Sequence, residues 1–449
     1  MKKKLKRSMG VIERDTASLG SAIHIRFYPL VVEEGRGSYV TDVDGNRYLD
    51  LVGGAAVAVT GHCHPKIVAS IKRQADKLIH NCFTLSSNEA TVDLAETLIR
   101  LTPGDFPKKV LFGLSGADAN ECVAKLIPYY TKKSRFISFI GAYHGQSMGA
   151  SALSGHTCQS RFPSYIPVTK VPYPYCYRCP FKLTYPQCDL HCAKFIEDYI
   201  LQTISPPEDT CALIIEPIQS DSGNIVPPDN FIPELKRMCE KYGILFVVDE
   251  VKTGFGRTGK MFAIEHSGVV PDMITMAKPI ASGMPLSACV AKSEILDCAI
   301  ASHLFTTGGN PISCAAALAT IDVIKEEKLV ENAANVGGYF MRQLQELKFR
   351  SKIIGDVRGK GMIFGIEFVK DKKTKEPAST ETAKVCYRAW EKGLITVYLG
   401  LYSNVMELTP PLNLTKEEVD LGVQMLSEAI EDVEQGRVAD EDIARYKGW

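Results

Sequence analysis

Apolar runs alternate with amphipathic helical segments through the middle of the chain. Between about residue 60 and residue 325, short β-branched runs without a polar face are each followed by a stretch with helical periodicity. Strands that are apolar on both sides are typical of a parallel sheet covered by helices on both faces. We therefore expect a large α/β domain over residues 61–325. Its predicted strands are KKVLFGL, SRFISFI, CALIIEPI, ILFVVDEV and MITMAK, with helices such as HPKIVASIKRQADKLI and IPELKRMCEKYG among them.

The two ends of the chain follow a different pattern. Short alternating stretches flank Asp44-Gly45, which predicts a β-hairpin because such a turn needs residues that accept positive φ. Two amphipathic helices with short strands between them follow residue 325. We expect residues 1–60 and residues 326–449 to build one smaller α+β domain together. The basic start, MKKKLKRSMG, is predicted to be a frayed, solvated arm, with a targeting or anion-binding role as the alternative.

Composition and charge exclude several classes of protein. The 449 residues include 52 Lys+Arg and 52 Asp+Glu, and this balance removes a general attraction to nucleic acid or to a membrane surface. No apolar run approaches the roughly 20 residues of a membrane span. The 14 cysteines, without a secretory signal, favour free thiols in a reducing compartment. We expect a cytoplasmic enzyme acting on a small molecule, with no nucleic-acid or membrane partner.

Candidate chemistry lies where the predicted strands end, which is the edge where open parallel sheets bind ligands. Ser115, Gly116 and Ala117 follow KKVLFGL and open a helix, so their turn suits an anion, although a plain tight turn explains it as well. Tyr143 lies between glycines after FISFI. It could stack on a flat ring, or it could pack as an ordinary loop residue.

The next two strand ends carry charged residues. Asp249 ends ILFVVD, and a buried carboxylate there needs a partner such as a protonated pyridine nitrogen; a metal or capping role fits as well. Lys278 ends MITMAK, and a buried amine suits Schiff-base chemistry, with a snorkelling surface lysine as the alternative. An anion cup, a stacking ring, a pyridinium partner and an amine together predict a site for pyridoxal 5'-phosphate.

The motifs that hold these residues resemble the class III aminotransferase family of fold-type I pyridoxal-phosphate enzymes. The resemblance runs from about residue 25 to the C-terminus through GHCHP, SGADAN, GAYHG, EPIQSD, DEVKTGFGRTGK, AKPIASGMPLSA and TTGGNP. It implies the type I fold of pyridoxal-phosphate-dependent transferases, with a large, mostly parallel sheet domain and a small domain from both termini. It also implies a homodimer, or a dimer of dimers, with active sites shared between subunits.

The resemblance assigns roles residue by residue. Lys278 would form the Schiff base, Asp249 would pair with the pyridine nitrogen, and Val251 would lie under the ring. Tyr143 would stack over the ring and contact the substrate. The remaining cofactor-binding positions that it implies are Ser115, Gly116 and Ala117 at the phosphate, His144 and Glu216 near the cofactor, and Thr306 at the neighbouring subunit's phosphate.

One position departs from the aminotransferase pattern. Members that act on amino acids usually hold the substrate carboxylate with an arginine before a Pro-Leu, and NVMELTPPL has Glu407 there. A carboxylate would repel a carboxylate, so Glu407 predicts a neutral or cationic substrate such as an amide, a lactam or an amine. Alternatively, Glu407 pairs with Lys252 or another base, and a different arginine binds the substrate.

A second departure concerns the reaction itself. EPIQSD has Asp221 where aminotransferases more often carry Glu, and the combination is most similar to α-amino-ε-caprolactam racemases, with isoleucine 2-epimerases more distant. Racemisation needs an acid/base on each face of the substrate, and the resemblance makes Lys278 and Asp221 those groups. We expect a pyridoxal-phosphate-dependent racemase or epimerase of amino-acid derivatives, with an aminotransferase using an amine or ω-amino donor as the alternative.

A Pro- and Tyr-rich insertion over residues 173–193 is not explained by any of these roles. Its cysteines could bind a structural zinc ion, form disulfides or remain free thiols, because CxxC is followed by a long gap and then CxxxC. No metal is expected in the reaction. The candidates are Cys176, Cys179, Cys188 and Cys192.

Overall fold

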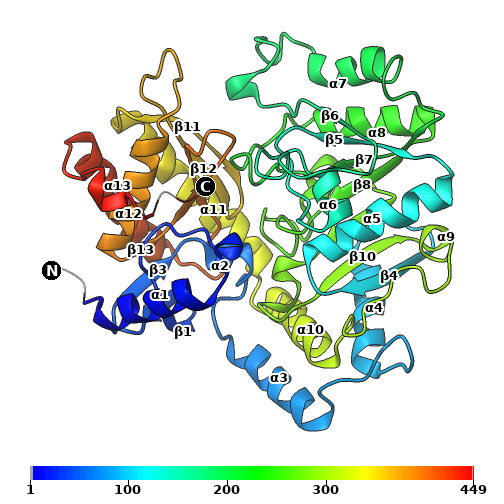
Figure 1. The fold of residues 1–449 in the computed structure, drawn as a ribbon, viewed down its shortest axis with the longest axis horizontal. Helices are drawn as coiled ribbons and strands as arrows, with labels where there is room; N and C mark the ends of the chain where they lie inside the picture. Colours follow the sequence, from blue (N-terminus) through cyan, green and yellow to red (C-terminus); the bar gives the residue numbers. More distant parts are fainter. Residues whose placement is uncertain (1–3, 447, 449) are drawn as a thin grey trace. The chain divides into compact units, whose positions relative to one another are not determined.

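The computed structural model describes residues 4–446 and residue 448, and the chain forms two compact units. The terminal unit combines Met1–His64 with Glu331–Trp449, and the large unit is Pro65–Val330. The chain therefore crosses between the units near residues 64 and 330, where the sequence analysis placed boundaries at 60 and 325. Each unit has its own sheets and its own helices (Figure 1).

A seven-stranded sheet with the order β4-β10-β9-β8-β7-β5-β6 forms the centre of the large unit. In the series β9-β8-β7-β5-β6, each strand is parallel to the next. Strand β10, in contrast, is antiparallel to both of its neighbours, β9 and β4. Strand β4 therefore runs in the same direction as β9, and the carboxyl ends of β4, β5, β7, β8 and β9 lie at one edge. The bounds are β4 Lys108–Gly113, β5 Arg135–Phe139, β6 Val168–Val171, β7 Thr210–Ile215, β8 Leu245–Asp249, β9 Met273–Met276 and β10 Ser287–Lys292.

Helices cover this sheet, and α5 lies across β4, β10 and β9 (Figure 1). Its apolar face, including Val123, Leu126 and Ile127, packs in one fully buried cluster with Phe136 and Val247 of the sheet. Burial of this face is the main stabilisation of the layer. The helices of the large unit are α3 Pro65–Lys77, α4 Glu89–Leu101, α5 Gly116–Thr131, α6 Met148–Leu153, α7 His191–Phe195, α8 Phe231–Tyr242, α9 Ser293–Leu296 and α10 Pro311–Glu326.

All five predicted strands are confirmed, as are the two predicted helices, which are α3 and α8. Strands β6 and β10 were not predicted. Strand β10 has the sequence SACVAK, whose small residues lack the long apolar run of its neighbours. Because β10 is antiparallel, it returns beside β9 through a short connection instead of a helical crossover.

The terminal unit contains two four-stranded sheets, with the orders β1-β2-β3-β13 and β11-β12-β15-β14. The predicted hairpin is confirmed as β2–β3, and Gly45 has φ +84° in its turn. The strands are β1 Val32–Arg36, β2 Tyr39–Asp42, β3 Arg47–Asp50, β11 Ile354–Lys360, β12 Ile363–Phe368, β13 Leu394–Ile395, β14 Val397–Leu399 and β15 Val405–Leu408. The helices are α1 Lys6–Ser18, α2 Gly53–Ala56, α11 Leu329–Arg350 (which begins at the end of the large unit), α12 Ser379–Lys392 and α13 Lys416–Glu434.

The prediction of a frayed N-terminal arm is wrong from residue 6 onward, because this segment forms α1. The Asp44 carboxylate accepts hydrogen bonds from the backbone N–H groups of Arg7 (2.9 Å) and Ser8 (2.8 Å). The first N–H groups of a helix have no partner within the helix, so a carboxylate at this position stabilises the helix start. The hairpin turn thus anchors α1.

Two further features concern the chain as a whole. All 14 cysteines are free thiols. None of the described helices offers an apolar stretch long enough to cross a bilayer.

Candidate active site

The turn between β4 and α5 contains the three residues that are predicted to bind an anion, and it is called the anion cup below. Ser115 is the N-cap of α5, and its Oγ accepts a hydrogen bond from the Asp118 N–H at 3.3 Å. The Asp118 carboxylate in return accepts the N–H groups of Leu114 and Ser115. Gly116 and Ala117 provide the next N–H groups of this first helical turn, where an anion is favoured by free donors and by the helix dipole.

Close packing explains the glycine in this cup. A Cβ on Gly116 would lie 2.7 Å from Val251 Cγ1, so the cup and the residue predicted to lie under the ring are in direct contact. The loop that contains Tyr143 also packs on the cup, since a Cβ on Gly145 (φ +129°) would lie 2.7 Å from Ala117 Cβ. The first three predicted pieces of the site therefore meet at one edge of the sheet.

Asp249 is buried and held by three donors. Its Oδ2 lies 2.7 Å from His144 Nδ1 and accepts a hydrogen bond from Asn120 Nδ2 at 2.7 Å. Its Oδ1 accepts the Val251 N–H at 2.9 Å. Asn120 is fixed in turn by the Thr275 hydroxyl, which donates to Asn120 Oδ1 at 2.9 Å. These contacts give the carboxylate one orientation, as a partner for a ring nitrogen requires.

His144 lies beside Asp249 and is fully buried. Burial by itself would lower the His144 pKa, but the Asp249 hydrogen bond and the charges of Asp249 and Glu216 outweigh it, and the pKa is raised. The contact with Asp249 therefore favours the charged form of His144. Its Nε2 has no hydrogen-bond partner among the described residues. The structure thus makes His144 a partner of Asp249, whereas the resemblance implied only a position near the cofactor.

Glu216 follows β7 and connects two of the loops. Its buried carboxyl accepts the N–H groups of Tyr143 and Ser220, both at 3.2 Å. Burial, opposed by His144 and reinforced by the charges of Asp249 and Asp221, raises the pKa of Glu216 to about 8. Glu216 is therefore mostly protonated at neutral pH. The hydroxyl of Tyr143 accepts a hydrogen bond from Gln146 Nε2 at 3.1 Å.

Asp221 forms an ion pair with Lys252. The distance between Lys252 Nζ and Asp221 Oδ1 is 3.4 Å, and the two side chains are 8% and 16% exposed. Burial would raise the Asp221 pKa, but the charges of Lys252, Lys278 and His156 lower it below its ordinary value. Asp221 is therefore an ionised carboxylate at neutral pH.

Lys278 is the first residue of a short 3-10 helix, Lys278–Ala281, directly after β9. It is partly exposed, and its charge acts on Asp221. Strand pairing places Asp249 opposite Thr275, three residues before Lys278 along β9. Lys278, Asp249 and Asp221 thus lie at or after the carboxyl ends of three neighbouring strands, β9, β8 and β7.

Two further predicted residues come from other segments of the chain. Glu407 is buried in β15 of the terminal unit, and Thr409 Oγ1 donates to Glu407 Oε1 at 3.5 Å. Thr306 is exposed, in the segment that follows α9. The roles proposed for both residues stay predictions.

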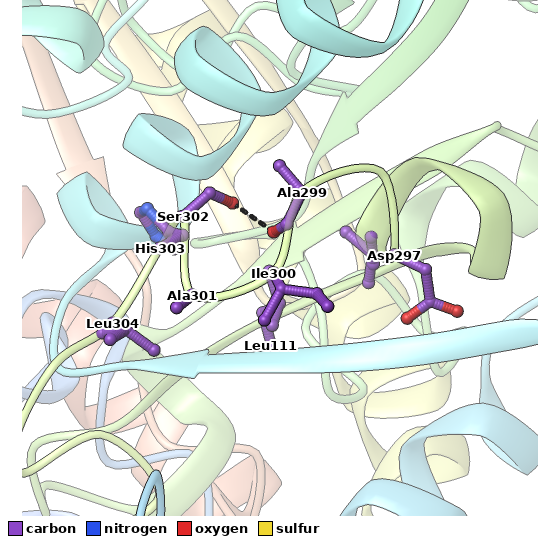
Figure 2. A pocket seen from close by; sticks show the side chains of 9 residues that line it. Leu111, Asp297, Ala299, Ile300, Ala301, Ser302, His303 and Leu304 are labelled. Atoms are coloured by element: carbon purple, nitrogen blue, oxygen red, sulfur yellow. Dashed lines mark hydrogen bonds between the residues drawn. The ribbon is translucent and has the colours of Figure 1, made fainter.

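The segment that leads to Thr306 also forms a pocket. Its volume is about 400 Å³, and it is lined by Leu111 of β4 and by residues 296–297 and 299–304 (Figure 2). The Ser302 hydroxyl donates to the Ala299 carbonyl oxygen at 2.8 Å and fixes the turn, while Ile300 is 98% exposed. No residue that lines the pocket belongs to the strand-end site, so the pocket is a separate feature.

The cysteine insertion has no arranged metal site. Among residues 4–446 and 448, no group of three or more His, Cys, Asp or Glu side chains is placed to hold a metal ion. Cys176 is exposed, and Cys179, Cys188 and Cys192 are partly buried.

Sequence reasoning missed two residues of the site. It gave no role to Asn120, although this residue lies one helical turn after Gly116 in SGADAN and so faces the same strand ends. It considered Lys252 only as a partner for Glu407. The signal that could have identified Lys252 is its position three residues after Asp249, in a segment with several buried residues.

Comparisons with known proteins agree with this geometry. The profile of the class-III aminotransferase family matches residues 22–430. The chain belongs to this family, and it is an enzyme of the type I fold of pyridoxal-phosphate-dependent transferases, as predicted.

Similar characterised proteins include racemases, an epimerase and aminotransferases. An alanine/serine racemase of Pyrococcus horikoshii is 41% identical over 96% of this chain and 92% of its own. A leucine/methionine racemase of Thermococcus litoralis is 41% identical over 99% and 100%. An isoleucine 2-epimerase of Lentilactobacillus buchneri is 38% identical over 99% and 100%. A 5-aminovalerate aminotransferase of Pseudomonas aeruginosa is 37% identical over 96% and 98%.

Solved structures of the same fold are aminotransferases. A Bacillus anthracis aminotransferase has a TM-score of 0.88 and 32% identity, and the match covers 95% of this chain and 99% of that one. An amine transaminase from an uncultivated Pseudomonas species, solved in its PLP-bound form, has a TM-score of 0.84 and 33% identity over 90% and 95%.

Pyridoxal phosphate is the cofactor of this family, and the residues fit it. Asp249 is buried and oriented by three donors, as a protonated ring nitrogen needs. Gly116 lets Val251 pack directly against the start of a helix that can receive a phosphate. Lys278 provides an amine at the neighbouring strand end.

Proposed function

We propose that this chain is a pyridoxal-phosphate-dependent racemase or epimerase. It would take the Cα proton of an amino acid or amino-acid derivative and return a proton on the opposite face. The observation that carries the proposal is the ionised Asp221, held by Lys252 and within electrostatic reach of Lys278. Relatives that are racemases and epimerases, at 38–41% identity, support it.

The residues of the large unit would hold the cofactor. The N-terminal turn of α5, with Ser115, Gly116 and Ala117, would bind the phosphate. Asp249 would hold the proton on the ring nitrogen, supported by His144. When bound, pyridoxal phosphate acts as an electron sink that makes the substrate Cα–H acidic.

Two groups of the chain would then move protons. In one direction the Asp221 carboxylate accepts the Cα proton and becomes a carboxylic acid, while the Lys278 ammonium donates a proton on the other face. In the reverse direction Lys278 is the base and Asp221 is the acid. Positioned acid–base groups of this kind contribute about 10²–10⁴-fold each to a rate. An aminotransferase needs only the lysine.

The substrate class follows from charge and from the relatives. Buried Glu407 would favour a neutral or cationic substrate, such as an amide or lactam, if β15 contributes to the substrate pocket. The relatives' names add free alanine, serine, leucine, methionine and isoleucine as substrates to test.

The assembly that we propose is a homodimer, or a dimer of dimers, in which Thr306 reaches the neighbouring subunit's phosphate. Exposed Thr306 and the exposed apolar side chains of Ile300 (98%) and Leu304 (56%) lie in one segment and support an interface there (Figure 2). A cytoplasmic location is also proposed, because all 14 cysteines are free thiols.

Chiral chromatography tests the function directly. The holoenzyme is incubated with one enantiomer of an amino-acid amide, of α-amino-ε-caprolactam or of a free amino acid, without any keto acid. We expect the opposite enantiomer to accumulate until the two are equal. Asp221→Asn should lower this inversion by about 10²-fold or more while the cofactor absorbance remains, because one of the two acid–base groups is lost. Full inversion by Asp221→Asn would contradict the role of Asp221.

The second candidate function is that of an aminotransferase with an amine or ω-amino donor. It is favoured by the family itself and by the relative that acts as a 5-aminovalerate aminotransferase. If the substrate is consumed only after pyruvate or 2-oxoglutarate is added, without inversion, this function is correct and the racemase proposal fails.

A further inference from the structure

Asp221 lies among several titratable groups, and few of them offer it a steady positive charge. Burial raises the pKa of Glu216 to about 8 and, with the charge of Asp221, raises that of Tyr143, so both are mostly neutral at pH 7. Burial lowers the pKa of His156, so the positive charge that it offers to Asp221 is lost more readily as the pH rises, and burial raises the pKa of the Cys158 thiol, which carries no positive charge. The groups around Asp221 are Lys252 after β8, Lys278 after β9, His156 and Cys158 after α6, Tyr143 after β5 and Glu216 after β7.

The two lysines differ in what the proposed reaction demands of them. Lys278 exchanges protons with the substrate, so its charge changes during each turnover. Lys252 has no such task, and its side chain is 8% exposed at 3.4 Å from Asp221. A buried carboxylate without a cation would take up a proton, because desolvation penalises the charged form.

We infer that Lys252 is a positioning residue whose ammonium keeps the Asp221 carboxylate ionised and in place for proton abstraction. The inference rests on the proposed racemase function. It goes beyond that function because it makes the pH range in which the enzyme is active depend on Lys252, which takes no proton from the substrate. Lys252 follows β8 directly after Asp249 and Val251, so one short segment supplies the cofactor ring and the second base with their partners.

The direction of the pH effect follows from the opposite effects of the Lys252 charge and of burial on the Asp221 pKa. The charge of Lys252 lowers the Asp221 pKa, so the carboxylate stays ionised down to acidic pH. Without this charge, burial dominates and the pKa rises. The reaction that begins with proton uptake by Asp221 would then lose activity as the pH falls, at a pH where the wild-type enzyme is still active.

The test is the pH profile of kcat/KM for both enantiomers, measured with Lys252→Met and Lys252→Gln holoenzymes. We expect the acid limb to move about 1–3 pH units upward for the enantiomer whose proton Asp221 takes, as expected for loss of a neighbouring charge. Lys252→Gln keeps a hydrogen-bond donor but removes the charge. Its pH profile provides the test if Lys252→Met folds poorly. Lys252→Arg should return the limb toward the wild-type position.

Deuterium exchange gives an internal reference. In D₂O, the enantiomer whose proton faces Lys278 should exchange its Cα–H with retention, and this exchange should be unchanged in Lys252→Met while inversion falls. Lys236→Met is the matched control, since Lys236 also lies 3.5 Å from a buried aspartate, Asp272, outside the site. It should leave both pH profiles unchanged.

The outcomes separate the two claims. If the wild-type enzyme inverts neither enantiomer without a keto acid, the proposed function fails. If the wild-type enzyme inverts its substrate and Lys252→Met and Lys252→Gln keep the wild-type acid limb, only the inference about Lys252 is overturned. Equal loss of inversion and of Lys278-side exchange at every pH would also overturn it, because it would indicate general disruption of the site.

Discussion

A single carboxylate in β15 determines which substrates we expect to be accepted. Glu407 is buried, with its carboxyl 3.5 Å from the Thr409 hydroxyl. If β15 contributes to the substrate pocket, a carboxylate at this position disfavours the carboxylate of a free amino acid. A neutral amide or lactam would meet no such repulsion.

Replacing Glu407 by arginine should therefore change specificity. We expect Glu407→Arg to raise kcat/KM for free amino acids relative to the corresponding amides by about 10-fold or more, which corresponds to about 1.4 kcal/mol. The measurement is the ratio of initial inversion rates for an amino acid and its amide. Glu407→Gln should change the ratio in the same direction but less. An unchanged ratio in both variants would show that Glu407 does not face the substrate.

At the level of elements, the first turn of α5 requires a glycine. In Gly116→Ala the new Cβ would lie 2.7 Å from Val251 Cγ1, and overpacking of this kind costs about 1–3 kcal/mol. We expect the Kd for pyridoxal phosphate to rise about 10-fold or more, measured by titrating the apoenzyme and following cofactor absorbance.

A helical glycine elsewhere provides the control for this prediction. Gly10 in α1 has no atom within 4 Å of an added Cβ, so Gly10→Ala should leave cofactor affinity unchanged. Wild-type affinity in Gly116→Ala would mean that the cup is not the phosphate site.

The elements also show what the sequence could and could not predict. Strands with long β-branched runs, and the charged residues that end them, were predictable because period and burial leave a local signal. The contact of Asn120 with Asp249 was not, since it joins a helix to a strand across 129 residues. The pairing of Lys252 with Asp221 depends on the direction in which the loop after β8 turns, and no local pattern encodes that direction.

For the whole molecule, the segment before Thr306 is where we expect a second copy of the chain to bind. Ile300→Asp should weaken the homodimer, because an apolar side chain that is 98% exposed in the single chain would be buried at the interface. The expected rise in the dimer Kd is about 10–100-fold, in line with about 1.5–3 kcal/mol for one buried apolar side chain. Sedimentation equilibrium measures it.

Phe349 allows a matched comparison for the dimer. It is 91% exposed in the last turn of α11 and does not belong to the segment proposed as the interface, so Phe349→Asp should leave the dimer Kd unchanged. Wild-type association of Ile300→Asp would contradict the proposed interface.

The antiparallel course of β10 has a mechanical consequence for Lys278. The segment that carries the lysine is tied at one end to β9 and at the other to β10, and these strands pair with each other, with Ala288 opposite Met276. Pro279 and Pro285 restrict the short connection further. A short segment whose two ends are held by paired strands has little backbone conformational freedom. We therefore expect the amine to change position by rotation about the bonds of its own methylene chain, while the backbone that carries it stays fixed between two paired strands.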